Sequence, residues 1–179
     1  LGRALAGVGF FDTYGARHRR YRRRVHYALH ACRRGGQGLV SGAEPLPQPR
    51  HIVVVSPGEV PWNDAERARM QALNERDVSI DYAFMVTVEK FMRHGCENVP
   101  DYMLSGSRGD FTGVGDIHFF YSADEVLYGA LPDFENACKR ANVPYTVSAR
   151  PKMVHCYCML PIFKEAKEDF AKIEDILKK

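Results

Sequence analysis

Short apolar runs and helix-spaced apolar positions alternate along most of this chain. Four segments have the length and apolar content of strands: His51–Val55, Ile117–Tyr121, Tyr145–Ser148 and Met153–Leu160. The turn residues Ser56-Pro57-Gly58 end the first segment. The last two segments are expected to pair as a hairpin around Ala149-Arg150-Pro151.

Helices are predicted where apolar residues recur three and four positions apart. Asn63, with Glu66 three positions later, is typical of a helix start. Ser122-Ala123-Asp124-Glu125 resembles a capping box, followed by a helix that Pro132 interrupts or restarts. Two further apolar stripes predict a middle helix and a closing helix: Ile80, Phe84, Val88 and Phe91, and then Phe163, Ala166, Phe170, Ile173 and Leu177.

Together these elements predict an α+β fold with a basic N-terminal helix or arm, a helical middle, and a small mixed sheet with a C-terminal helix. The expected boundaries are a basic arm over 1–36, a linker rich in proline and glycine over 37–50, and a compact body over 51–179. A chain of 179 residues with 45% hydrophobic content can bury one core of this kind.

Charge is distributed very unevenly along the chain. The first 36 positions hold nine arginines and one acidic residue, whereas the remaining positions hold 16 basic and 21 acidic residues. Between Arg17 and Arg34, helical spacing would place an apolar stripe and a basic stripe on nearly opposite sides. A cluster of one sign repels itself unless an anion neutralises it, so this segment indicates a polyanionic partner.

Arginine is suited to phosphate binding because its guanidinium makes paired hydrogen bonds, and the planar group also stacks on bases. We therefore expect an RNA-binding segment comprising Arg17, His18, Arg19, Arg20, Tyr21, Arg22, Arg23, Arg24, Arg33 and Arg34. A solvated charged face, a helix on anionic lipid and a leftover targeting presequence are the alternatives. The absence of an initial methionine would suit removal of a targeting peptide.

One stretch in this basic segment resembles a known family. Gly9-Phe10-Phe11, followed by Tyr14-Gly15-Ala16-Arg17-x-Arg19-x-Tyr21-Arg22, is similar to the opening motif of the L-twenty family of bacterial-type large-subunit ribosomal proteins. Arg69-Met70-Gln71-Ala72 and Ile80-x-Tyr82 resemble a second stretch of that family, so the likeness touches roughly residues 7–38 and 67–104.

The resemblance implies a non-enzymatic structural constituent of a large ribosomal subunit, in a divergent mitochondrial form located in the matrix. Its partners would be rRNA and neighbouring ribosomal proteins, with no small-molecule substrate and no cofactor. An accessory subunit of a mitochondrial respiratory or ATP synthase complex is the alternative function. A small α/β enzyme is a third, which a pocket holding titratable side chains from different strands would favour.

Several other sites are not expected. Five cysteines without a Cys-x-x-Cys pair argue against a disulfide framework and a ribbon-type zinc site. No stretch has the roughly 18 apolar residues of a membrane span. The glycines of Ser105–Asp116 lack the Gly-Lys-Ser/Thr ending of a phosphate loop, so a plain loop is expected there.

His155-Cys156-Tyr157-Cys158 is the one place where potential metal ligands lie close together in sequence. On a strand, Cys156 and Cys158 would share a face and His155 would point away, so we expect a buried strand rather than a metal site. A Cys–His nucleophile is not expected either, because the sequence offers no recognisable acid to orient the histidine. No catalytic residue is predicted.

Overall fold

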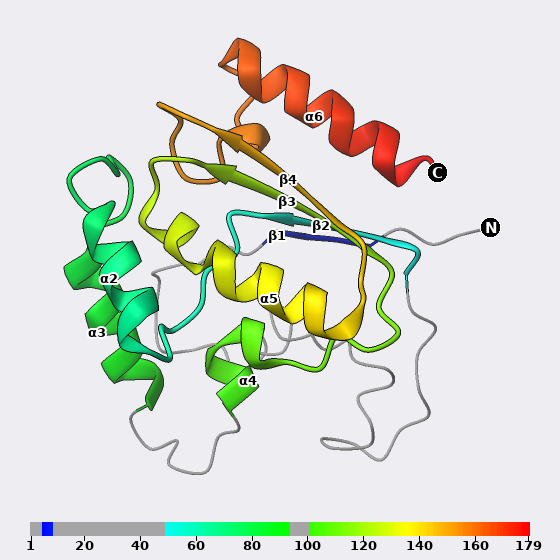
Figure 1. Ribbon diagram of the computed structural model, residues 1–179. Helices are drawn as coiled ribbons and strands as arrows, with labels where there is room; N and C mark the ends of the chain where they lie inside the picture. Colours follow the sequence, from blue (N-terminus) through cyan, green and yellow to red (C-terminus); the bar gives the residue numbers. More distant parts are fainter. Residues whose placement is uncertain (1–4, 9–48, 94–100) are drawn as a thin grey trace.

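A computed structural model describes residues 5–8, 49–93 and 101–179, and these form a parallel sheet with helices on both faces (Figure 1). The sheet order is β1-β2-β3-β4, with bounds Leu5–Val8, His51–Val55, Asp116–Ser122 and Tyr145–Arg150. Each neighbouring pair is parallel. The prediction of mixed helices and strands is confirmed, but the prediction of a mixed sheet is wrong because all four strands run the same way.

The described helices follow the apolar stripes of the sequence. The α-helices are α2 Asp64–Ala72, α3 Tyr82–Arg93, α4 Asp101–Leu104, α5 Leu131–Ala141 and α6 Lys164–Leu177. Short 3-10 turns lie at η2 Gly106–Arg108, η3 Val126–Ala130 and η4 Tyr157–Met159. The helical middle and the C-terminal helix are confirmed. The predicted cap is confirmed as well, because Asn63 Oδ1 accepts a hydrogen bond of 2.8 Å from the backbone N–H of Glu66.

Apolar residues cover both faces of the sheet, and each face packs on its own helices. Alternation along β3 sends Phe119 to one face, where it meets Phe134 of α5 with ring centroids 5.7 Å apart. Phe120 points to the other face and joins the cluster that contains Ala166 and Ile173 of α6. Figure 1 shows α6 on one side of the sheet and α5 with α2 on the other. Burial on both faces explains why the strands are short continuous apolar runs.

The segment after β4 is not the strand that its sequence predicts. Pro151 and Lys152 form a turn, and the chain then crosses the end of the sheet as a loop leading into η4. Lys152 and Cys156 both adopt the left-handed backbone conformation, with φ of 59° and 55°, which extended strands do not contain. Tyr157 and Cys158 are buried against the α6 face, so their burial arises from a loop and not from a strand.

A buried carboxylate fastens this loop to the closing helix. Asp169 of α6 accepts hydrogen bonds from Arg150 Nε at 2.8 Å and Arg150 Nη2 at 3.0 Å. Tyr157 Oη donates to the same carboxylate at 2.6 Å, and so does Lys172 Nζ at 2.6 Å. Burial would raise the pKa of Asp169, but these four donors hold it well below its usual range.

Several predictions fall on residues that the structure does not describe. The basic helix and the linker belong to this group, while Leu5–Val8 of the predicted arm pairs with β2 as strand β1. The domain boundaries stay predictions. Across residues 5–8, 49–93 and 101–179, every helix is too short or too polar to cross a membrane.

Candidate active site

The loops that follow β2, β3 and β4 meet at one edge of the sheet. Because the strands are parallel, their carboxyl ends all lie at this edge, where open α/β sheets generally bind ligands. Ser56 follows β2 directly, Glu125 lies three residues beyond β3, and His155 lies five residues beyond β4. Three segments that are distant in sequence therefore supply polar side chains to one place.

Glu125 and His155 form a hydrogen-bonded pair at the centre of this edge. His155 Nδ1 lies 2.8 Å from Glu125 Oε2. The other carboxylate oxygen of Glu125 accepts from Ser56 Oγ at 2.8 Å and from the backbone N–H of Ser122 at 3.0 Å. The carboxylate has no exposed surface, and the His155 side chain is 18% exposed. Fixed hydrogen bonds thus hold the carboxylate in place, and the carboxylate in turn orients the imidazole.

The second imidazole nitrogen faces a thiol. His155 Nε2 lies 3.2 Å from Cys156 Sγ. The backbone N–H of Cys156 donates to Ser56 Oγ at 3.0 Å, so Ser56 bridges the thiol-bearing residue and Glu125. An ionised carboxylate can only accept hydrogen bonds, so His155 Nδ1 carries the proton that is donated to Glu125. Nε2 is then the nitrogen that can exchange a proton with the thiol. The result is a line of acid, imidazole and thiol.

Electrostatics favour a charged imidazole at this position. Burial alone would lower the pKa of His155, but its hydrogen bonds with Cys156 and Glu125 raise it to about 10. Burial raises the pKa of Glu125, and the hydrogen bonds from His155, Ser56 and the Ser122 backbone act against that increase. Burial also raises the pKa of Cys138 to about 11 and that of Cys158 to about 12, which keeps these two thiols protonated and unreactive.

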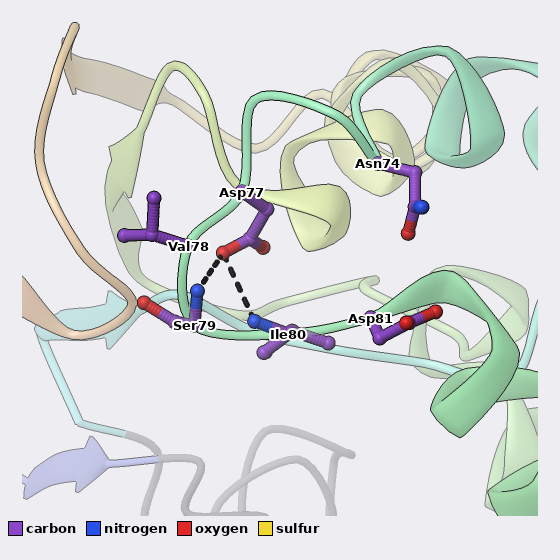
Figure 2. Close-up of a pocket in the computed structure, with 6 residues that line it drawn as sticks. All are labelled: Asn74, Asp77, Val78, Ser79, Ile80 and Asp81. Carbon is purple, nitrogen blue, oxygen red and sulfur yellow. Dashed lines mark hydrogen bonds between the residues drawn. The ribbon is translucent and has the colours of Figure 1, made fainter.

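A shallow pocket of about 220 Å³ borders the histidine loop (Figure 2). Its lining residues are Asn74, Asp77, Val78, Ser79, Ile80 and Asp81. Ser79 Oγ accepts from the backbone N–H of His155 at 3.2 Å, which connects the pocket wall to the site. Asp77 Oδ1 accepts from the N–H groups of Ser79 and Ile80, as Figure 2 shows, and its Oδ2 accepts from Val126 beside Glu125.

Unfavourable backbone conformations are concentrated in the same loops. Outside glycine, the described residues with positive φ are Ser56, Asn142, Lys152 and Cys156. Asn142 ends α5, where such a conformation is usual. The other three lie in the loops that build the site, with φ between 44° and 59°. Non-glycine residues persist in this region only where their surroundings enforce it, which is common at functional sites.

The sequence shows His155 next to Cys156, but the buried strand predicted around them is wrong. A Cys–His arrangement was rejected because no orienting acid was visible, yet Glu125 supplies that acid from 30 positions earlier. Glu125 was interpreted as a capping residue; it does reach back to the Ser122 N–H, while its second oxygen binds His155. The useful signal was the order of an acid after one strand and a histidine after the next.

The predicted RNA-binding residues lie outside the described part of the chain. They are Arg17, His18, Arg19, Arg20, Tyr21, Arg22, Arg23, Arg24, Arg33 and Arg34. Within the described residues, no group of three or more His, Cys, Asp and Glu side chains has a metal-binding arrangement.

Solved structures similar to this chain include esterases and lipases. An esterase from the bacterial hormone-sensitive lipase family matches 97% of this chain and 52% of its own, with a TM-score of 0.68 and 20% identity. A hormone-sensitive lipase from a metagenome library matches 74% and 45%, with a TM-score of 0.64 and 19% identity. An esterase/lipase from an uncultured bacterium matches 74% and 44%, with a TM-score of 0.57 and 18% identity. No family model and no curated protein matches the sequence.

These likenesses identify the fold as that of the α/β-hydrolases, and the chain spans about half the length of the structures it matches. They overturn the prediction of a ribosomal protein of the L-twenty family. The expectations of rRNA and ribosomal partners, of no small-molecule substrate and of no enzymatic activity are wrong with it, as is the alternative of an accessory subunit. A short motif beside a basic cluster was used to infer a whole protein, although most of the chain forms a different fold.

Proposed function

We propose that this chain contains the acid–base part of an ester hydrolase, with His155 as the proton-transfer group and Glu125 as the residue that orients it. The observation that supports the proposal is the 2.8 Å bond between His155 Nδ1 and a fully buried carboxylate. In α/β-hydrolases the acid precedes the histidine in sequence, and both follow strands of the sheet. Glu125 and His155 have this order and these positions.

The geometry defines what each group does. Glu125 keeps the Nδ1 proton on its own side of the ring, so Nε2 is the atom that accepts a proton from a nucleophile and returns it to the leaving alkoxide. The charge of Glu125 stabilises the imidazolium that forms between these two steps. Ser56 and the Ser122 N–H hold the carboxylate during both. The mitochondrial location inferred from the sequence stays a prediction.

The test is hydrolysis of p-nitrophenyl acetate and p-nitrophenyl butyrate by the purified chain. One of the similar structures, an esterase, was soaked with the butyrate ester, which makes it a suitable probe. We expect His155→Gln to lower kcat/KM by about 10³-fold, since proton transfer by a positioned side chain contributes about 10²–10⁴-fold. Glu125→Gln should lower it by about 10²-fold or more, because an amide no longer stabilises the imidazolium.

The matched control is His118→Gln. His118 lies near the opposite end of the sheet, where its ring nitrogens contact Thr146 and His51. This variant should hydrolyse both esters at the rate of the original chain. If the original chain releases no p-nitrophenol above the buffer rate, or if His155→Gln is as active as His118→Gln, the proposed function is wrong.

A further inference from the structure

The described part of the chain places one nucleophilic side chain against the proton-transfer nitrogen. Cys156 Sγ lies 3.2 Å from His155 Nε2, within the distance at which a nucleophile contacts its base. In α/β-hydrolases a serine in a Gly-x-Ser-x-Gly turn normally has this role. The 179-residue sequence has no Gly-x-Ser-x-Gly. In the described part of the chain, the thiol of Cys156 makes this contact with His155 Nε2.

The backbone around this thiol is held in a defined conformation. Cys156 has φ 55° and ψ 28°, and its N–H is bound to Ser56 Oγ at 3.0 Å. Ser56, with φ 44°, also donates to Glu125, so one side chain fixes both the acid and the thiol-bearing residue. Cys158, two positions later, lies in the same loop, yet only Cys156 is in contact with the histidine among the described thiols.

We propose that Cys156 is the nucleophile of this site, which makes the chain a thiol-dependent ester hydrolase. The inference rests on the proposed function and names the group that His155 serves. The raised pKa of His155 is consistent with it, because a charged imidazole beside a thiol stabilises the thiolate.

The reaction balances with water as the only co-reactant. The Cys156 thiolate attacks the ester carbonyl carbon, a C–S bond forms, and the carbonyl π electrons move to oxygen. When the C=O bond re-forms, the C–O bond of the leaving group breaks and the alcohol takes the proton from His155 Nε2. Water then attacks the thioester and gives its proton to Nε2. The C–S bond breaks, and the acid and the thiolate–imidazolium pair are released. The His155 side chain is 18% exposed, whereas Cys156 is 5% exposed.

Two measurements test the inference. First, the full chain is mixed with p-nitrophenyl butyrate, quenched in acid and digested, and peptide mass spectrometry should locate a butyryl group on Cys156. Second, iodoacetamide at about pH 6 should alkylate Cys156 at least about tenfold faster than Cys158, and His155→Gln should remove that difference.

The matched variants are Cys156→Ala and Cys158→Ala, each of which replaces one thiol of the same loop with a methyl group. The first should lower hydrolysis by about a hundredfold or more, and the second should leave it unchanged. Circular dichroism before the assay checks that both variants are folded. Hydrolysis by Cys156→Ala at the original rate, or a butyryl group on another residue, overturns the inference and leaves the proposed function standing. A complete absence of hydrolysis by the original chain overturns both.

Discussion

Replacing Asp169 with asparagine should destabilise the fold by about 3 kcal/mol. The Asp169 carboxylate has no exposed surface and accepts from four donors, two of them on Arg150. Asparagine keeps one oxygen and turns an NH₂ group toward donors. At least two charge-assisted bonds are therefore lost, each contributing about 1.5 kcal/mol. Removing one partner of a buried ion pair costs about 3–5 kcal/mol, and the lower end applies because the Arg150 side chain is 29% exposed.

Urea denaturation followed by far-ultraviolet circular dichroism measures this difference. Asp175→Asn is the control, because Asp175 lies on the same helix but its side chain is 76% exposed. Its ion pair with Lys178 is long, at 3.8 Å, and both partners face solvent. That variant should unfold at the same urea concentration as the original chain. If Asp169→Asn lies within about 1 kcal/mol of the original chain, the Asp169 contacts do not stabilise the packing of α6 on the site loop.

Two further predictions concern stability on the other face of the sheet. Burial and the neighbouring charge of Glu66 raise the pKa of Glu59 well above the ordinary range of a glutamate. A carboxyl with a raised folded-state pKa stabilises the fold below the unfolded pKa and loses that contribution as pH rises through the folded value. Glu59→Gln should therefore flatten the decline in unfolding free energy from about pH 5 to pH 8, whereas the exposed Glu75→Gln should not; equal slopes would contradict this. Gly129→Ala should cost about 2 kcal/mol in a thermal melt, because the added Cβ would lie 2.7 Å from the backbone N of Met70. A melt like that of the original chain would show that α2 can shift at this contact.

The sequence predicted the elements that depend on local pattern. The strands at His51–Val55 and Ile117–Tyr121 and the helix start at Asn63 needed only neighbouring residues, and all three are present. Strand order and direction depend on crossover connections and on which helix covers which face, and no local pattern encodes those. The hairpin prediction failed for this reason: Tyr157 and Cys158 pack against α6 from a loop, so their burial does not indicate a strand.

The site could be predicted only in part. His155 and Cys156 are adjacent, so both are visible in the sequence. Their hydrogen-bond partners are distant in sequence: Glu125 lies 30 positions before His155, and Ser56 lies 100 positions before Cys156. Side chains that meet at one edge of a parallel sheet become neighbours only after the sheet is assembled. The basic cluster between Arg17 and Arg34 led to a wrong prediction of function. Its strong local charge suggested an RNA-binding protein, whereas the strands and helices of the other residues form a hydrolase-like fold.

The left-handed backbone at Cys156 has a consequence for anyone who redesigns this chain. A residue with a Cβ costs roughly 1–2 kcal/mol more than glycine in that conformation. Glycine at position 156 would relieve this strain, but it would also leave empty the space of a buried side chain. Glycine would remove the thiol that we propose as the nucleophile, so backbone strain and the proposed chemistry compete at this single position. Engineering programmes should keep the cysteine fixed and seek tolerance to heat elsewhere.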